Sequence, residues 1–176
     1  MRELRDKIGQ TVVLSSLTPR GALVILAVPS TSPIEIGVRP GSELSFHSSA
    51  QGKVLLAFSP RPFQERVLSR ELPKLTDKTV IDREKLEREL FKVQKDGYAA
   101  APEEALLGIN AIAAPVFDKQ DAVIAAVALV GSIQFLPATP NDQMLSALKD
   151  CCEQISRKFG HGRGEGVFYP ATRRDR

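Results

Sequence analysis

The sequence predicts an α+β fold, in which an antiparallel sheet packs against helices. Two groups of apolar, β-branched segments separated by turn residues indicate strands joined by hairpins. Between these groups, and again after the second one, apolar residues recur with helical spacing. Strand groups that alternate with helices in this way are typical of a sheet flanked by helices. The length of 176 residues is that of one domain, with or without a short appendage.

The chain begins with a segment that predicts a helix. In Met1–Gly9, Leu4 and Ile8 lie four residues apart among charged residues, and Gly9 suits the left-handed conformation that ends many helices. The first residue offers no capping side chain. Such a helix is either the end of a longer one or a short N-terminal helix in its own right.

Three strands are expected next. Thr11–Leu17 and Ala22–Val28 are joined by Thr18–Gly21, whose proline and glycine positions suit a type I turn. Ala22–Val28 is apolar on both faces, as in a covered central strand. Ile34–Val38 has its apolar residues at alternate positions and predicts the third strand. Tight turns between these strands predict an antiparallel meander.

The helical region that follows contains side chains that can cap helix N-termini by accepting hydrogen bonds from free backbone N–H groups. These candidate caps are Ser48 or Ser49, Ser59 and Asp82. Pro60 then occupies the first turn of the second helix, where proline is favoured. The expected helices are Ala50–Phe58, a helix from Pro60 to about Arg70, and a helix that ends at Gly97.

The second strand group is expected to form a hairpin. A short strand at Tyr98–Ala101 precedes Gly108–Phe117 and Ala122–Val130, which are separated by polar turn residues. Pro115 lies inside the first hairpin strand, and proline lacks the N–H that a central strand position needs. We therefore expect a sheet edge or a β-bulge at Pro115.

The C-terminal part predicts one long helix and a tail. The helix is expected from about Asp142 to Phe159, and Gly160 ends it. Its apolar stripe consists of Leu145, Leu148, Cys152, Ile155 and Phe159. Residues 161–176 are rich in glycine and arginine, which predicts a mobile basic tail.

The composition argues against several classes of protein. The sequence has no apolar run of about 18 residues that could span a membrane, and Met1–Gln10 lacks the apolar core of a signal peptide. Cys151 and Cys152 are adjacent, which excludes an ordinary disulfide, and two histidines do not suffice for a structural zinc site. The net charge of +3 is too small to indicate a nucleic-acid surface. We therefore expect a cytoplasmic protein without metal, cofactor or membrane contact.

The segment Phe46–Lys53 is the richest in chemistry and allows three interpretations. Ser48 or Ser49 could be a nucleophile with His47 as its base, although adjacent residues rarely align a hydroxyl with an imidazole. In the second interpretation, one of the serines only caps the helix. In the third, the free N–H groups at the start of this helix bind an anion, and Gly52 lets the ligand come close.

The adjacent acids Glu103 and Glu104 are candidates for acid–base chemistry. Neighbouring carboxylates diverge, and no motif in the sequence ties a partner to them. We therefore expect both in a solvated turn or at a helix N-terminus between Pro102 and Gly108.

Three stretches together resemble one known family. They are Gly41–Phe58, with the pattern H-x-S-A-x-G-K; Gly97–Asp118, with E-E-x-x-x-G and A-A-P-V-F-D; and Ala122–Gly131. Their combination at this spacing resembles the C-terminal effector-binding domain of the isocitrate-lyase-regulator (IclR) type of bacterial transcriptional regulator. The resemblance extends from Met1 to about Gly160.

The resemblance implies a GAF-like fold, with helices on both faces of an antiparallel sheet and a pocket for a small molecule. Residues 1–10 would be the end of a linker helix from a winged helix-turn-helix domain that is missing here. Residues 11–160 would form the effector-binding domain, followed by the tail 161–176. The implied role is to bind a metabolite, to hold homodimers or homotetramers together, and so to control DNA binding by the missing domain, without catalysis.

The resemblance also implies which residues contact the effector. They are Ile36, Ala50, Gln51, Gly52, Ala101, Ile109, Ala111, Ala128 and Val130. Ala101, Ala128 and Val130 are apolar where small-acid binders of the family often carry polar groups. Our hypothesis is therefore a larger organic acid, an aromatic or acyl carboxylate, whose acid group faces the Ala50–Gly52 amides and the Gln51 side chain.

Two other functions remain open. One is a small serine hydrolase-like enzyme that uses Ser48 or Ser49. The other is a purely oligomerising domain with a filled pocket. Small residues such as Ala101, Ala111 and Ala128 argue that space is left over for a ligand.

Overall fold

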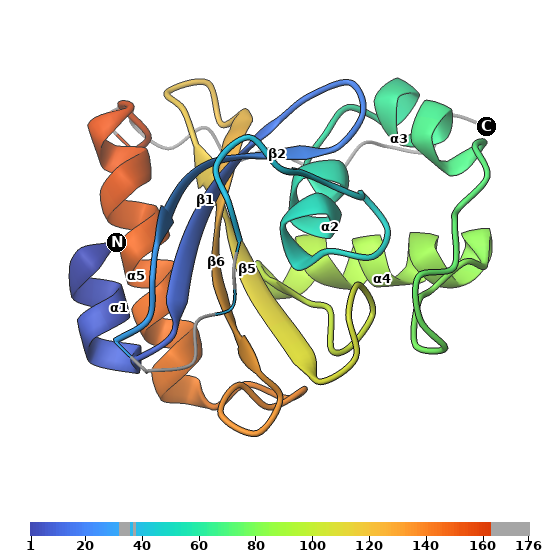
Figure 1. Ribbon diagram of the computed structural model, residues 1–176. Coiled ribbons are helices and arrows are strands. Elements are labelled where there is room, and N and C mark those ends of the chain that lie inside the picture. Colours follow the sequence, from blue (N-terminus) through green and yellow to red (C-terminus); the bar gives the residue numbers. More distant parts are fainter. Residues whose placement is uncertain (32–35, 37, 163–176) are drawn as a thin grey trace.

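The computed structural model describes residues 1–31, 36 and 38–162 (Figure 1). Over these residues, one six-stranded sheet lies between two layers of helices. In chain order, the elements are α1 (Arg2–Ile8), β1 (Thr11–Leu17), β2 (Ala22–Val28), β3 (Glu43–Leu44), α2 (Ala50–Ala57), α3 (Arg61–Leu68), α4 (Arg83–Asp96), β4 (Ala99–Ala100), β5 (Ile109–Phe117), β6 (Val123–Ser132) and α5 (Asp142–Lys158). The predicted α+β fold is confirmed.

The sheet has the strand order β3-β2-β1-β6-β5-β4, and every pair of neighbours is antiparallel. β1, β2 and β3 form a meander, and β5 and β6 form the predicted hairpin. The two groups join through β1 and β6, where Thr11 lies opposite Val130 and Ser16 opposite Ala125. The first strand of the described chain thus pairs with the last one in the centre of the sheet.

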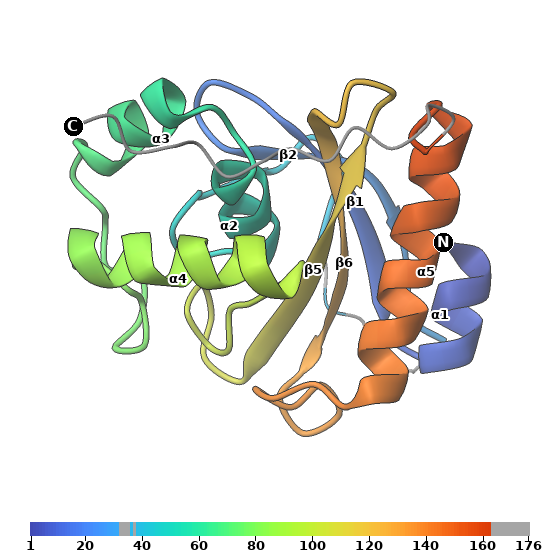
Figure 2. The same ribbon diagram turned by 180° about the vertical axis from the view of Figure 1, so that it is seen from behind.

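The helices divide between the two faces of the sheet. α1 and α5 cover one face, whereas α2, α3 and α4 lie on the other (Figure 1, Figure 2). Alternate side chains of each strand supply the two cores, as β6 illustrates. Ala128 and Val130 belong to the core beneath α2, and Leu129 belongs to the core beneath α5.

Local signals in the sequence set most helix ends. The Ser49 hydroxyl accepts a hydrogen bond from the Gly52 N–H (3.0 Å) and caps α2, and the Asp82 carboxylate caps α4 by accepting from the Lys85 N–H (2.7 Å). Gly97 ends α4 with φ at 72°, in the left-handed region that favours glycine. These caps confirm the predicted starts of both helices.

Two expected helix features are wrong. Ser59 does not cap α3, because its hydroxyl donates to the Leu55 carbonyl oxygen (2.7 Å) and Pro60 occupies the capping position. Phe159 does not extend the apolar stripe of α5, because it lies beyond the last helical residue and is 57% exposed.

The third strand lies elsewhere than expected. Ile36 and Val38 are in no strand, and the rest of the expected strand Ile34–Val38 lies outside the described residues. β3 follows the Arg39–Gly41 turn instead, and it has only two residues, which is too short for an alternating pattern to reveal. The expected tail also lies outside the described residues from position 163 onwards.

The expectation for Pro115 is confirmed. β4 pairs with Ile112 and Ala113 of β5 and does not reach Pro115, so β5 is a sheet edge at the proline. A register shift between Val116 and Phe117 follows directly.

Candidate functional site

The N-terminal turn of α2 is pressed against the chain that precedes it. All eight residues of α2 are buried, and the helix lies against the face of the sheet opposite α1 and α5 (Figure 2). A Cβ atom on Gly52 would lie only 2.2 Å from the Ser45 carbonyl oxygen and 2.7 Å from the Phe46 Cα. Glycine at this position is therefore required by packing against the segment before α2, whether or not a ligand approaches it.

The sheet face beneath α2 carries most of the effector contacts that the resemblance implies. Ala111 lies opposite Val130, and Ala113 lies opposite Ala128, so two rows of small side chains face the helix. The Ala101 N–H donates to the Ala111 carbonyl oxygen (3.0 Å), which brings Ala101 to the same place. One apolar cluster contains Ile36, Ala50, Ala101, Ile109, Ala111, Ala128 and Val130.

Gln51 and Gly52 complete the predicted set in the first turn of α2. The Gln51 side chain is only 1% exposed, and its Oε1 has no hydrogen-bond partner among the described residues. The buried Ser48 hydroxyl in the adjoining turn also lacks a partner there. An unsatisfied buried polar group costs about 1–3 kcal/mol, so these two atoms are unfavourable for folding.

The neighbouring serine and histidine are engaged with the backbone. The Ser49 hydroxyl donates to the Ser45 carbonyl oxygen (2.7 Å) besides capping α2. His47 Nε2 lies 2.9 Å from the Pro73 carbonyl oxygen, which can only accept, so Nε2 carries the proton. Burial lowers the pKa of His47 below its ordinary value. Within the described residues, neither Ser48 nor Ser49 forms a hydrogen bond with His47.

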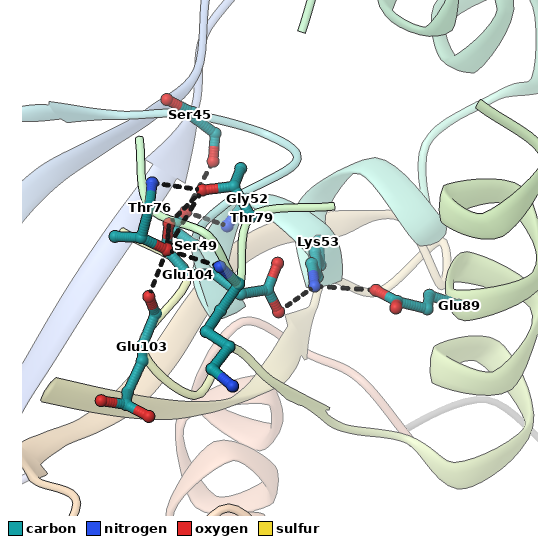
Figure 3. Close-up of polar contacts among 10 residues, drawn as sticks. Ser45, Ser49, Gly52, Lys53, Thr76, Thr79, Glu89, Glu103 and Glu104 are labelled. Carbon is teal, nitrogen blue, oxygen red and sulfur yellow. Dashed lines mark hydrogen bonds and ion pairs between the residues drawn. The ribbon is translucent and has the colours of Figure 1, made fainter. Parts of the chain in front are cut away.

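A buried lysine lies one turn further along α2. Lys53 has a side chain only 2% exposed, and its ammonium group contacts Glu104 Oε1 (2.6 Å) and Glu89 Oε2 (2.8 Å). Figure 3 shows the two carboxylates on opposite sides of the ammonium. Because burial disfavours the charged form, the pKa of Glu104 is raised, although Lys53 opposes the rise.

The expectation of a solvated Glu104 is wrong. Glu104 is 5% exposed, because its carboxylate turns inward to neutralise Lys53. Glu103 has φ at 57°, and its carboxylate accepts from the Gly108 N–H (2.9 Å), so the two acids diverge as expected. Two threonine hydroxyls donate to the backbone carbonyl oxygens of these acids (Figure 3). Thr76 donates to Glu103 and Thr79 donates to Glu104, each at 2.7 Å.

The sequence contained one signal for this ion pair. Lys53 is the only charged residue of the largely apolar segment Ala50–Phe58. A charged residue inside an apolar helix is rarely buried without a partner of opposite charge. The identity of that partner depends on the fold, because Glu89 and Glu104 come from α4 and from the loop after β4.

A separate cavity opens beside the ion pair. It has a volume of about 420 Å³ and lies between α4, β4 and residues 138–140, with Lys53 and Glu104 among its lining residues. Across the part of the chain that the structure describes, no cluster of three His, Cys, Asp or Glu side chains could hold a metal ion. Within the same residues, no helix is long and apolar enough to cross a membrane.

Comparison with known sequences identifies close relationships. Residues 1–157 match the family model described as bacterial transcriptional regulator IclR C-terminal. The chain is 31% identical over 163 residues to the glycerol operon regulatory protein of Streptomyces coelicolor, covering 92% of this chain and 64% of that protein. It therefore spans less than two thirds of the length of this relative.

Solved structures show the same fold. The Thermotoga maritima IclR has a TM-score of 0.83 at 30% identity, over 91% of this chain and 65% of that one. An IclR homologue from Microbacterium hydrocarbonoxydans, complexed with 4-hydroxybenzoate, has a TM-score of 0.82 at 26% identity, over the same shares of the two chains.

Proposed function

The chain belongs to the IclR family of bacterial transcriptional regulators, and on this premise we propose that it is a sensor for a small organic acid. In this proposal residues 11–160 bind the acid, residues 1–10 end a linker helix, and residues 161–176 are a tail. The acid changes how a DNA-binding domain of the whole regulator is presented, in a homodimer or homotetramer. Such control needs only that the acid bind one arrangement of the regulator more tightly than another.

One observation carries the proposal. Gln51 is almost completely buried at the first turn of α2, yet its Oε1 has no partner among the described residues. The same turn is the N-terminus of α2, whose partial positive charge favours an anion. A carboxylate bound there would accept hydrogen bonds from the helix N-terminus and from the Gln51 amide N–H, whereas the unpartnered Oε1 would accept a hydrogen bond from a hydroxyl group of the ligand.

The surrounding face supports an acid with an apolar body. Ala101, Ala111, Ala128 and Val130 are small or medium-sized and offer no polar side-chain atom. In a very small, strongly hydrated acid, the polar atoms beside the carboxylate would lose their water at this face without replacement hydrogen bonds. The Microbacterium homologue is complexed with an aromatic carboxylate, 4-hydroxybenzoate, which is a ligand of this kind.

The proposed role is binding without turnover. The Ser49 hydroxyl already donates to the Ser45 carbonyl oxygen and accepts from the Gly52 N–H. His47 Nε2 donates to the Pro73 carbonyl oxygen. A nucleophile and its base need to contact each other, at least in the reactive complex. Hydrolysis of a chromogenic ester that disappears in Ser49→Ala would contradict this role and favour the hydrolase.

Isothermal titration calorimetry with a panel of acids tests the proposal. We expect 4-hydroxybenzoate, benzoate or hexanoate to bind, and the two- and three-carbon acids glyoxylate and pyruvate to bind more weakly. Gln51→Ala should weaken binding by at least about tenfold, because a hydrogen bond to a charged group is worth about 1.5–3 kcal/mol. Gln154→Ala, on the exposed side of α5, is the matched control and should change nothing.

Two results would refute parts of this proposal. Binding of only the two- and three-carbon acids would exclude the apolar body. An unchanged dissociation constant for Gln51→Ala would remove Gln51 from the site.

A further inference from the structure

The cavity between α4, β4 and residues 138–140 is distinct from the proposed effector site. Its volume of about 420 Å³ lies within the range of small-molecule sites, about 300–1,000 Å³. Gln51 and Lys53 are two residues apart on α2, so their side chains point in very different directions around the helix. The effector site lies at Gln51, and the cavity lies at Lys53.

Three exposed lysines converge on the rim of this cavity. Lys85 and Lys92 are seven residues apart on α4 and therefore share a helix face, and Lys78 comes from the loop before α4. None of the three lies within 4.0 Å of a carboxylate oxygen in the described part of the chain. Of the acids that line the cavity, Asp96 lies four residues after Lys92, one turn further along the same face of α4.

The floor of the cavity, formed by Lys53, Glu89 and Glu104, has a net negative charge, in contrast to the positively charged rim. Lys53 neutralises one of the two carboxylates that contact it, so the group of Lys53, Glu89 and Glu104 carries an excess negative charge when both acids are ionised. The Lys53 ammonium has three N–H donors, and Glu89 and Glu104 accept from two of them. This floor repels an anionic group and favours uncharged hydroxyl groups, so anionic groups should lie at the lysine rim.

The walls indicate an organic ligand. Val80, Val93, Ala99 and Pro140 line the cavity together with Tyr98. Apolar walls favour carbon groups over fully hydrated inorganic ions. The combination of charged rim, polar floor and apolar wall is typical of metabolite sites.

We propose that this cavity is a second binding site, for a small hydroxylated organic anion with two or more negative charges. The anionic groups contact Lys78, Lys85 and Lys92, and the hydroxyl-bearing part lies over Lys53 and Glu89. The charges can come from carboxylates or from a phosphate ester. The site goes beyond the proposed function and does not depend on Gln51.

The test uses the full chain, labelled with ¹⁵N, and two probes. Citrate represents a hydroxylated polycarboxylate and 3-phosphoglycerate a hydroxylated phosphate ester. We expect at least one probe to shift the amide resonances of Ala99 and Ala100 in a saturable manner, whereas sulfate at matched ionic strength should not. Lys92→Gln should weaken this binding by about fivefold, as expected for the loss of one ion pair at an exposed position.

Matched variants separate the possible results. Lys95→Gln removes an exposed lysine from the same helix outside the cavity, and it should leave the affinity within about twofold of the wild type. Gln51→Ala should also leave it unchanged, even if the proposed effector site fails its own test. The probe that shifts these resonances shows whether the site prefers carboxylates or a phosphate ester.

Four outcomes would overturn the second site. They are no shift at Ala99 and Ala100 with either probe, equal shifts with sulfate, equal weakening by Lys95→Gln and Lys92→Gln, or loss of the shifts in Gln51→Ala. The last outcome would place the probe in the site beneath α2.

Discussion

The two faces of the sheet are covered by different kinds of buried side chain. Beneath α1 and α5, bulky aliphatic residues such as Ile112, Leu129 and Leu148 are completely buried. Beneath α2 and α4, the strands present alanines such as Ala113 and Ala128, and α2 and the loop after β4 add the buried polar groups Gln51, Lys53 and Glu104. The same strands supply both faces, so the contrast within the sheet arises from the choice of residue at alternate positions.

This contrast separates stability from function. Burial of large apolar side chains stabilises the fold by about 1.5–3 kcal/mol for each residue. Buried polar groups with unsatisfied atoms lower stability and are retained where they serve another purpose. The face beneath α5 is therefore a structural core, and the face beneath α2 is where the proposed ligand-binding groups lie.

The largest effect is expected at the buried ion pair. Lys53→Met should lower the free energy of unfolding by about 3–5 kcal/mol, because it leaves buried Glu104 without its cation. Urea unfolding followed by circular dichroism measures the change. The double variant Lys53→Met/Glu104→Gln should recover part of the loss, since the uncompensated charge is gone.

The matched change on the other face is Leu148→Ala, which should cost about 2–5 kcal/mol through the cavity it creates. Lowering the pH so that Glu104 becomes protonated should reduce the cost of Lys53→Met and not that of Leu148→Ala. Equal pH dependence of the two variants would contradict the separation of the faces.

A smaller effect of opposite sign is expected at Gln51. Gln51→Leu should leave stability unchanged or raise it by about 1 kcal/mol, because it removes an unsatisfied polar atom from the interior. The same variant should weaken binding of an organic acid. Gln64→Leu is the matched control: the Gln64 amide donates to the Ala57 and Ser59 carbonyls, so its loss should destabilise the protein. Similar unfolding midpoints for the two variants would argue against a special role of Gln51.

The smallest effect concerns pH. Burial holds the pKa of His47 below the ordinary value of 6.5. As pH falls below about 6.5, the unfolded chain takes up a proton that the folded chain resists, so the free energy of unfolding falls. His47→Gln should remove this contribution.

The measurement compares urea midpoints at about pH 7.5 and about pH 5.5 in both proteins. The wild type should lose more stability on acidification than His47→Gln does. The raised pKa of Glu104 acts in the opposite direction. Because this carboxyl holds its proton more readily in the folded chain, its contribution to the free energy of unfolding falls as pH rises. That contribution is present in both proteins and cancels in the comparison.

The sequence predicted the fold well where a local signal existed. Both strands of the first hairpin were placed correctly, since Pro19 and Gly21 mark the turn between them. Ser49, Asp82 and Gly97 marked helix ends through side-chain or backbone chemistry that acts over a few residues. β3 has only two residues and was missed, because so short a strand depends on its pairing with Ala22 and Leu23.

The site was less predictable, because its groups meet only after folding. The sequence alone suggested a solvated turn for Glu104, whereas the cation it neutralises lies on α2, far away in the chain. The resemblance to IclR regulators indicated Gln51, and its unpartnered oxygen became visible only in the packed structure. The effector contacts that the resemblance implies remain predictions until a ligand is bound.

The pairing of Thr11 with Val130 also has a consequence for biosynthesis. A hairpin of β1 and β2 can form as soon as it leaves the ribosome, but its other edge has no partner until β6 has been made. Contacts between residues so distant in sequence close a long loop and form slowly. Until then β1 presents an open apolar edge, which is the kind of surface that chaperones bind and that aggregates form on. The interval between synthesis of β1 and β6 is therefore the period in which this chain is most exposed to misfolding.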